Sequence, residues 1–398
     1  MSQPRKPQPT TKRTDLPPLK PVTSRRPART AASRKPVRPA TPVPETSTSP
    51  QDTPRTFKQR LRRAWSRTWK IGLVLMLIAL VVGYWQVHAL AQAMVQADAR
   101  TNPPLGLMLP SAVNVLVMGV DERPDHPEEG VRSDSLMLAR IDPAGRWINL
   151  LSIPRDSLVN LPDLGSTKIN AAYGYGYANA EALYGTHTTP QQGGMAQAAA
   201  AVEQLLLLHE RGMRVDYTVQ VNFDGFAGLI DAMGGVWIDV PYALIDEAYP
   251  TPDLQTMRVE FQPGLQHMDG ATALIYARTR HADSDFSRSA RQQQVLRAMV
   301  ANMQQRNWFE RTALFSALLD QMQSASSDQV PIITTMPINR PDVLLGGLLL
   351  ASGLNPHQIG QLALNPDHVW VTEIGSDLIW DETGIRNQMD LLLQAPEG

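Results

Sequence analysis

The sequence predicts a mixed α/β domain that follows a single transmembrane helix. One uncharged apolar run is long enough to cross a bilayer. Behind it, short Val- and Leu-rich runs typical of strands alternate with longer stretches typical of helices. The alternation has no regular βαβ period, which predicts a mixed sheet with helices on both faces. None of the 398 residues is cysteine, and this excludes a disulfide framework and a thiolate metal site.

The first part of the chain is strongly basic. Residues 1–70 hold 18 Lys and Arg against 3 Asp and Glu, whereas residues 71–398 hold 19 against 35. Residues 1–56 are rich in Pro, Ser, Thr and Arg and predict a disordered tail, because they cannot bury enough apolar surface to offset their ordering entropy. In residues 57–70 an aromatic residue or Leu recurs every four positions between basic residues. This pattern predicts a basic amphipathic juxtamembrane segment, or simply the end of the next helix.

Residues 71–92 are predicted to form a transmembrane signal anchor. With His88 neutral, residues 71–97 carry no formal charge, and the run is longer and further from the start of the chain than in a cleaved signal peptide. The excess of Lys and Arg before it predicts a cytoplasmic N-terminus. We therefore expect a single-pass protein of the cell membrane, with a linker at 93–112 and an extracytoplasmic catalytic domain at 113–398.

Within that domain, apolar runs and turn residues define the expected elements. Strands are expected at residues 113–120, 135–141, 147–153, 215–221 and 236–240. Helices are expected at residues 195–211, 224–233, 269–277, 288–303 and 308–322. A loop is expected at 185–194, and the three Gly-Gly doublets, at 193, 234 and 346, are interpreted as turns or caps. Helix and strand alternate from residue 341 to the end.

Two acids lie at predicted strand ends. Asp121 closes the first strand, and Asp134 precedes the second. Two such acids alone are more often caps or turn formers. Flanked by Arg123, Arg132 and Arg155, they suggest half of a polyphosphate site that holds Mg²⁺ or Mn²⁺.

Residues 276–294 hold four arginines, Arg278, Arg280, Arg288 and Arg291, in an otherwise acidic domain. A guanidinium presents a planar fork of donors that suits phosphate oxygens. Taken alone, the segment reads as a solvated charged loop. Outside a membrane and near an acid pair at a sheet edge, it predicts a pyrophosphate-binding site.

Other chemistries lack their motifs. The sequence has no zinc spacing of histidines, no GxSxG and no GxxxxGK[ST] loop. Phosphoryl transfer remains, because positioning and cationic charge supply most of its catalysis. The apolar runs at 295–303 and 344–350 are candidates for a lipid slot or for ordinary core.

Six blocks in order resemble the LytR-CpsA-Psr family of cell-wall ligases: GVDER (119–123), RSDSLML (132–138), SIPRD (152–156), KINAAY (168–173), FDGFAGLIDAMGGVWIDVP (223–241) and YARTRHADSDFSRSARQQQ (276–294). The resemblance implies a three-layer α/β/α domain with a mixed central sheet and a hydrophobic tunnel for a polyprenyl chain. The long, weakly charged insert at 175–193 and the long basic tail depart from the family pattern.

The resemblance also implies a phosphotransferase that moves a phosphoglycan from a polyprenyl-pyrophosphate carrier onto peptidoglycan with Mg²⁺. By this resemblance, the metal falls to Asp121 and Asp134. The pyrophosphate falls to Arg132, Arg155, Arg278, Arg280 and Arg288, with Asp285 and Gln292 in support. The residues placed at the chemistry itself are Arg155, Arg278, Arg280 and Asp134.

The expected partners are the lipid-linked glycopolymer, peptidoglycan and membrane lipids, and no nucleic acid is expected. Three alternatives stay open. A polyprenyl pyrophosphatase would need the same phosphate site without an acceptor. A non-catalytic regulator would use the basic tail on DNA, although the tail has no helix-turn-helix pattern. A silent lipid-carrier-binding protein would bind the donor without reacting.

Overall fold

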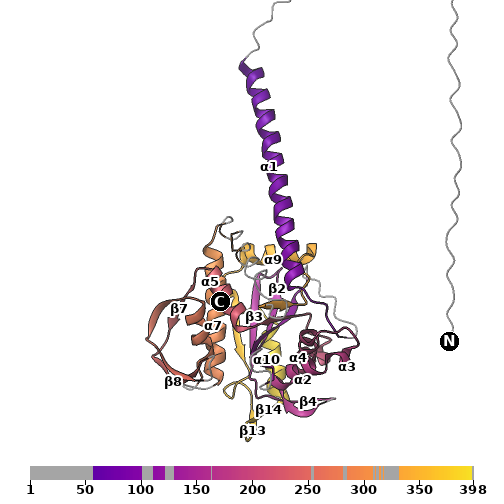
Figure 1. Cartoon of the computed structure of the whole chain (residues 1–398), viewed down its shortest axis with the longest axis vertical. Coiled ribbons are helices and arrows are strands. Elements are labelled where there is room, and N and C mark those ends of the chain that lie inside the picture. Colours follow the sequence, from indigo (N-terminus) through magenta and orange to yellow (C-terminus); the bar gives the residue numbers. More distant parts are fainter. Residues whose placement is uncertain are drawn as a thin grey trace, which may run out of the picture. The chain divides into compact units, whose positions relative to one another are not determined.

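The computed structural model describes residues 57–100, 111–121, 130–162, 164–251, 255–280, 285–307 and 331–396, and residues 310, 313, 314 and 317. Figure 1 shows the element labels. The predicted helix at 308–322 lies largely outside the described residues, as do the predicted tail and Arg123.

One long helix, α1 (Phe57–Met94), opens the described chain. It is continuous, so the amphipathic segment and the apolar run share one helix. In the described part of the chain, only the stretch Trp69–Met94 is long and apolar enough to cross a membrane. Its large apolar side chains from Ile71 to Trp85 are exposed, as a bilayer-facing surface requires.

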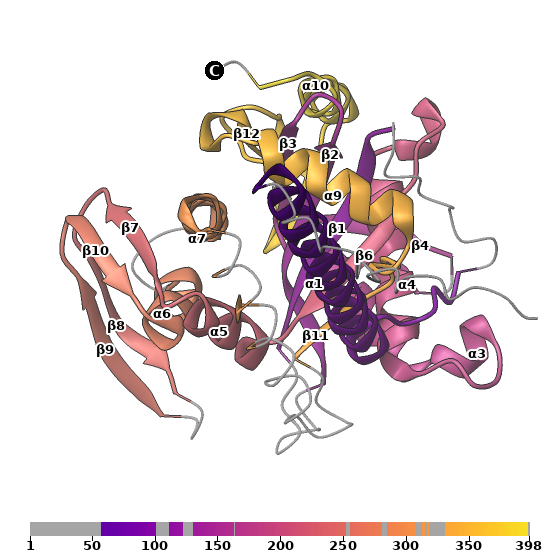
Figure 2. The same ribbon diagram turned by 90° about the horizontal axis from the view of Figure 1, so that it is seen from above.

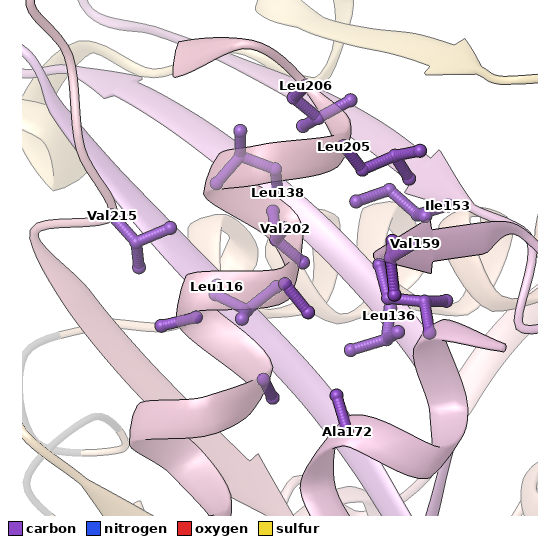
Figure 3. Packing of buried hydrophobic residues seen from close by; sticks show 14 of the residues in the cluster. Leu116, Leu136, Leu138, Ile153, Val159, Ala172, Val202, Leu205, Leu206 and Val215 are labelled. Carbon is purple, nitrogen blue, oxygen red and sulfur yellow. The ribbon is translucent and has the colours of Figure 1, made fainter. Parts of the chain in front are cut away.

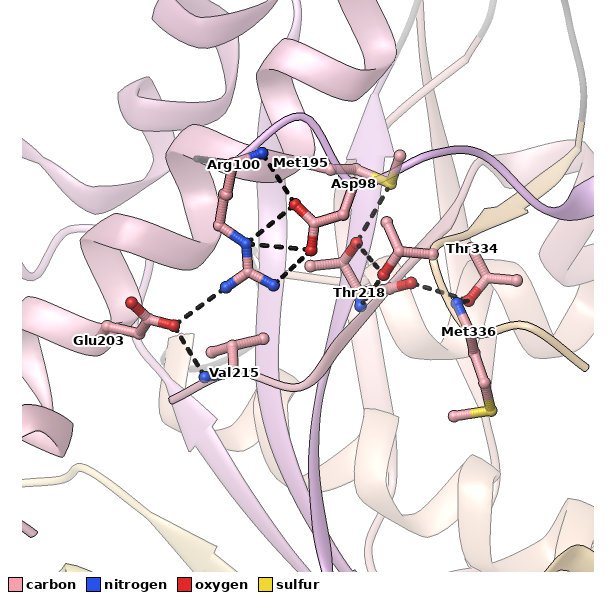
Figure 4. Close-up of polar contacts among 9 residues, drawn as sticks. Asp98, Arg100, Met195, Glu203, Val215, Thr218, Thr334 and Met336 are labelled. Atoms are coloured by element: carbon pink, nitrogen blue, oxygen red, sulfur yellow. Dashed lines mark hydrogen bonds and ion pairs between the residues drawn. The ribbon is translucent and has the colours of Figure 1, made fainter. Parts of the chain in front are cut away.

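The residues that follow α1 bond to the folded domain. The backbone N–H of Gln96 donates to the carbonyl of Thr334 in β11 (Ile332–Thr334) at 2.8 Å. Arg100 is buried, and its Nη1 lies 3.0 Å from Glu203 Oε1 in a polar network that Figure 4 shows. The first residues of the predicted linker are therefore fixed to the domain.

A six-stranded mixed sheet forms the centre, with strand order β11-β6-β1-β2-β3-β12. The β1–β2, β2–β3 and β11–β6 pairs are antiparallel, and the β1–β6 and β3–β12 pairs are parallel. This confirms the predicted mixed sheet. The strands are β1 (Val113–Asp121), β2 (Arg132–Asp142), β3 (Trp147–Ile153), β6 (Tyr217–Val221) and β12 (Ile359–Ala363).

Alternate residues of these strands enter two different hydrophobic clusters. Leu116, Leu138 and Ile153 pack with Val202 of α4 in the cluster that Figure 3 shows. Helices α2 (Ile169–Ala178), α4 (Pro190–Leu205) and α10 (Glu382–Leu392) contribute to this cluster. Their strand neighbours, such as Val115, point to the opposite face and pack with residues of α9 (Pro341–Gly353) and α7 (Asp285–Gln305).

A second group of strands lies beside α7 (Figure 2). It contains the antiparallel β7–β10 pair and the β8–β9 hairpin, and its core joins Ile230, Val236 and Tyr276 to Val295 of α7. Its elements are α5 (Phe223–Ala232), β7 (Val236–Val240), β8 (Leu244–Pro250), β9 (Thr256–Phe261), β10 (Gly264–Met268) and α6 (Gly270–Arg278).

The remaining elements are short. They are β4 (Leu158–Leu161), β5 (Gly165–Lys168), α3 (Ala180–Tyr184), η2 (Leu208–Arg211), η3 (Pro356–Gln358), β13 (Val371–Ile374) and β14 (Asp377–Trp380).

Two glycine doublets differ from the prediction. Gly193 and Gly194 lie inside α4, which begins at Pro190 with a capping box between Thr189 and Gln192. The predicted loop at 185–194 was therefore wrong at its end. A Cβ on Gly193 would lie 2.4 Å from the carbonyl oxygen of Gly176, so these glycines allow α2 and α4 to pack closely. The doublet at 346 is likewise inside a helix, α9. The doublet at 234 has φ values of 68° and 84° and is a turn, as predicted.

Candidate active site

A cavity of about 300 Å³ opens at the C-terminal ends of the parallel strands β1 and β6. We call it the main cavity. It is bordered by the start of β2, by α5, by the end of α6 and by α7, so it draws on segments more than 180 residues apart. Polyphosphate and nucleotide ligands of α/β proteins commonly bind at this edge of a sheet.

A β-bulge sets the position of Asp134. Gly119 pairs with Ser135 and Val120 pairs with Ser133, so Asp134 has no partner in the β1–β2 register. Such a bulge re-aims a side chain next to a site. Asp121 ends β1, and both acids line the main cavity, as the sequence predicted for a pair at one sheet edge.

Arg155 lies opposite this acid pair. Its Nη1 donates to Asp134 Oδ1 at 3.0 Å, and its Nε lies 3.6 Å from Asp156 Oδ2. The side chain of Arg155 is 16% exposed. It follows β3 and lines the main cavity next to Asp134.

Three of the four arginines of residues 276–294 line the same cavity. Arg278 ends α6, and its guanidinium carbon lies 3.8 Å from the centre of the Phe223 ring. Its Nη1 also donates to the Tyr249 hydroxyl at 3.2 Å. Arg280 is exposed at the cavity, and its backbone N–H donates to the buried Asp246 Oδ2 at 3.2 Å. Together with Arg155, we call Arg278, Arg280 and Arg288 the arginine cluster.

Arg288 and Gln292 enter from α7. Arg288 is 7% exposed, and its Nη2 donates to the backbone carbonyl of Asp134 at 3.1 Å. Gln292 Oε1 accepts from the Ser135 hydroxyl at 2.7 Å. These contacts attach α7 to the bulge that carries the acid.

Most of the remaining lining of the main cavity is apolar. Phe226 and Leu229 of α5, Leu274 of α6, and Leu296 and Met299 of α7 line it. Of the two runs predicted as lipid-slot candidates, 295–303 therefore contributes two side chains. The other, 344–350, forms part of α9, and the structure places none of it in this lining.

Two predicted phosphate residues are not among those that line the main cavity. Arg132 lines a second cavity, of about 370 Å³, together with Arg155 and Lys168. We call it the polar cavity. The side chain of Asp285 lies outside the described residues, although its backbone starts α7.

Arg291 is a structural residue. It is 5% exposed, its Nε donates to the carbonyl of Tyr276 at 3.1 Å, and its Nη2 donates to the carbonyl of Thr279. Both carbonyls lie at the C-terminal end of α6, where helical carbonyls lack intrahelical partners. Arg291 therefore supplies hydrogen-bond donors to these carbonyls of α6 and fixes the segment that carries Arg278.

Three side chains at the site were not predicted from sequence. Ser135 sits in a strand pattern that gave no sign of its bond to Gln292. Phe223 opens α5 and stacks on Arg278, and only its place in a motif block could have marked it. Tyr249 belongs to the β8–β9 hairpin, whose alternating polar residues gave no strand signal.

The hydroxyl of Tyr249 stays protonated at neutral pH. Burial raises the pKa of Tyr249 above its ordinary value, and the positive charge of Arg278 opposes this only in part. The phenol is therefore a neutral acceptor for the Arg278 guanidinium.

Two carboxylates at one cavity fit a hard divalent cation. Mg²⁺ commonly binds through one or two carboxylates plus substrate phosphate oxygens and water. Asp121 and Asp134 offer such a pair, while the described residues contain no cluster of three or more His, Cys, Asp or Glu side chains. An all-protein metal cage is thus not present in the described part, and a site completed by phosphate is compatible with the residues.

The fold and the site therefore define an α/β domain in which one cavity is lined by both guanidinium groups and apolar side chains. The model of the LytR_cpsA_psr family matches residues 83–336, and this chain belongs to that family.

Curated relatives carry transferase names. The chain is 35% identical over 195 residues to "polyisoprenyl-teichoic acid–peptidoglycan teichoic acid transferase TagV" of Bacillus subtilis, a match that covers 48% of this chain and 43% of the relative. It is 31% identical over 257 residues to the transferase TagU of Oceanobacillus iheyensis, covering 61% of this chain and 71% of the relative. The chain spans about half the length of several of the curated relatives it matches.

Solved structures share the fold. The crystal structure of B. subtilis TagV has a TM-score of 0.51 and 24% identity, over 71% of this chain and 96% of that one. The protein gbs0355 from Streptococcus agalactiae has a TM-score of 0.51 and 21% identity, over 70% and 88%.

Proposed function

We propose that this chain is a membrane-anchored phosphotransferase that moves a phosphoglycan from a polyprenyl-pyrophosphate carrier onto peptidoglycan. One observation carries the proposal. A single cavity is lined both by the arginine cluster with two carboxylates and by apolar side chains such as Phe226, Leu296 and Met299. A lipid pyrophosphate has the matching polarity. The names of the family members TagV and TagU, which specify polyisoprenyl-teichoic acid and peptidoglycan, support the same reaction.

In this proposal the prenyl chain occupies the apolar part of the main cavity, and the pyrophosphate lies among the arginines. Bidentate guanidinium–phosphate contacts fix the donor. The stacking of Arg278 on Phe223 and its bond to Tyr249 hold that guanidinium in place before the donor binds, and preorganised charge is what stabilises a phosphoryl-transfer transition state.

The reaction is a direct displacement. The oxygen of an acceptor hydroxyl bonds to the sugar-proximal phosphorus, the bond from that phosphorus to the bridging oxygen breaks, and polyprenyl phosphate leaves with the electron pair. Asp134 and Asp121 are the two candidates to take up the hydroxyl proton through a water molecule. The arginine cluster stabilises the charge that develops on the leaving phosphate.

Asp121 and Asp134 would hold Mg²⁺ or Mn²⁺, which neutralises charge on the pyrophosphate oxygens when bound. Chelation with EDTA should then abolish transfer, and added Mg²⁺ should restore it. Full activity of the chelated enzyme would contradict this assignment.

The proposal extends to the organisation of the chain. Residues 1–56 form a basic cytoplasmic tail, residues 57–70 a juxtamembrane segment that meets anionic lipid, and residues 71–92 the transmembrane anchor. The domain at 113–398, which follows the linker at 93–112, lies outside the cytoplasm as a three-layer α/β/α unit. The asymmetry of Lys and Arg across the anchor supports this orientation.

Product analysis with and without glycan acceptor tests the function. The full-length protein in detergent, given labelled polyprenyl-pyrophosphate donor, should label peptidoglycan and release polyprenyl phosphate only when acceptor is present. Release at the same rate without acceptor would identify a pyrophosphatase instead. Binding of the donor without any product would identify a carrier-binding or regulatory protein.

A further inference from the structure

The polar cavity borders the arginine cluster but does not belong to the donor site described above. It is lined by Arg132, Arg155, Asp156, Thr167, Lys168, Asn170 and Ala171. No apolar side chain larger than alanine takes part in this lining. Its chemistry therefore suits a hydroxylated ligand rather than a prenyl chain.

The two cavities lie on opposite faces of the central sheet. Val117 and Leu296 of the main cavity belong to the hydrophobic cluster of the face that α7 and α9 cover. Asn170 and Ala171 of the polar cavity belong to α2, whose Ile169 and Ala172 pack into the cluster of the other face.

Arg155 is the residue that the two cavities share. Its Nη1 bonds to Asp134, which lines the main cavity, and its Nε lies 3.6 Å from Asp156, which lines the polar cavity. Lys168 Nζ is held 2.6 Å from Asp156 Oδ1 and 2.8 Å from Ser376 Oγ. A group bound at Arg155 can therefore be reached from either face.

The geometry of in-line displacement requires the donor and the acceptor to approach the phosphorus from opposite sides. The attacking and leaving oxygens of a phosphoryl transfer lie on opposite sides of the phosphorus. If the leaving prenyl phosphate occupies the main cavity, the attacking hydroxyl must arrive from the other side of the phosphate. The polar cavity is the candidate for that side, because it shares Arg155 with the main cavity.

We propose that the polar cavity binds the sugar of the peptidoglycan acceptor and delivers its hydroxyl to the phosphorus. The proposal rests on the proposed function and names the acceptor site within it. Lys168, Asn170 and Thr167 supply donors and acceptors for sugar hydroxyls and amides, and Arg155 receives the phosphate between the two substrates.

The test fills the polar cavity and measures the two substrates separately. Ala171→Leu adds a larger side chain from α2 at a site that lines the cavity, and Leu is nearly as good a helix former as Ala. We expect the KM for acceptor to rise at least about tenfold, which corresponds to about 1.4 kcal/mol, while the Kd for labelled donor, measured without acceptor, stays within about twofold. Ala178→Leu, at the exposed end of the same helix, is the matched control and should change neither.

Lys168→Gln is a second variant that keeps the cavity open. It should also raise the acceptor KM and leave donor binding unchanged. An unchanged acceptor KM in both variants, or a loss of donor affinity in both, would overturn the proposal, the latter because it would make this cavity a donor site. If the wild-type protein transfers nothing to peptidoglycan, the proposed function itself fails. If the wild-type protein does transfer to peptidoglycan, an unchanged acceptor KM or a loss of donor affinity in both variants overturns only the acceptor assignment.

Discussion

Arg288 and Arg291 are three residues apart on α7 and almost equally buried, at 7% and 5% exposure. Arg288 lines the main cavity and contacts the backbone of Asp134. Arg291 donates to the carbonyls of Tyr276 and Thr279 at the C-terminal end of α6 and is not among the residues that line the main cavity. Burial and charge therefore do not decide the role of an arginine here. The role depends on the groups that the guanidinium contacts. We therefore expect Arg288 to serve activity and Arg291 to serve stability.

The largest expected effect is on catalysis at Arg288. Arg288→Ala should lower the transfer rate about 10²- to 10³-fold, as loss of one preorganised donor to a developing charge typically does. The melting temperature should fall less than in the Arg291→Ala variant, since Arg288 lines the main cavity and water can reach the Asp134 carbonyl that loses its donor. Arg297→Ala, elsewhere on α7 and outside both cavity linings, is the control and should retain the wild-type rate. A wild-type transfer rate in the Arg288→Ala variant would contradict a catalytic role for Arg288 that differs from the structural role of Arg291.

The same comparison predicts the opposite result at Arg291. Arg291→Ala leaves the carbonyls of Tyr276 and Thr279 without their donor, so the free energy of unfolding should fall by about 3 kcal/mol. Urea unfolding of the protein in detergent measures this. A variant as stable as the wild type would mean that Arg291 does not support α6.

Phe226→Ala tests the apolar lining of the main cavity. Removal of this ring should weaken binding of a long prenyl pyrophosphate about tenfold or more, because less apolar surface is buried. Binding of inorganic pyrophosphate should not change. Equal losses for both ligands would show that the ring acts on the phosphate site and not on the chain.

Tyr249→Phe should have the smallest effect. It removes only the neutral acceptor of Arg278, and loss of one such bond predicts a reduction in rate of about threefold to tenfold. Because burial raises the pKa of Tyr249, the phenol stays protonated up to its ordinary value of about 10. The Arg278 guanidinium therefore donates to a neutral phenol below that pH and to a phenolate, a stronger acceptor, only above it. The ratio of wild-type to variant rates should be flat between pH 6 and pH 9, and a step in that range would contradict a neutral phenol.

The sequence predicted the buried strands well and the polar ones poorly. Residues 147–153 and 236–240 are strands at the expected bounds. They were predictable because each segment carries several apolar side chains in a pattern typical of a strand. The β8–β9 hairpin was missed, since LIDEAYP and TMRVEF mix charged with apolar residues and are held by pairing to each other. The glycines of α4 were predicted as turn residues. They are needed for the close contact between α4 and α2, which exists only in the folded chain.

For the candidate site, residue type was easier to predict than residue position. Asp121, Asp134, Arg155, Arg278, Arg280, Arg288 and Gln292 were all expected, and all line one cavity. Arg132 was expected beside them but lines the polar cavity, together with Arg155 of the arginine cluster. No pattern could separate Arg288 from Arg291, since their difference comes from how α7 packs against α6.

An experimental structure with a bound polyprenyl pyrophosphate tests the central claim most directly. We predict phosphates within hydrogen-bond distance of Arg278, Arg280 and Arg288, with the prenyl chain in contact with Phe226 and Met299. A chain bound outside the main cavity, or phosphates held away from the arginine cluster, would contradict it.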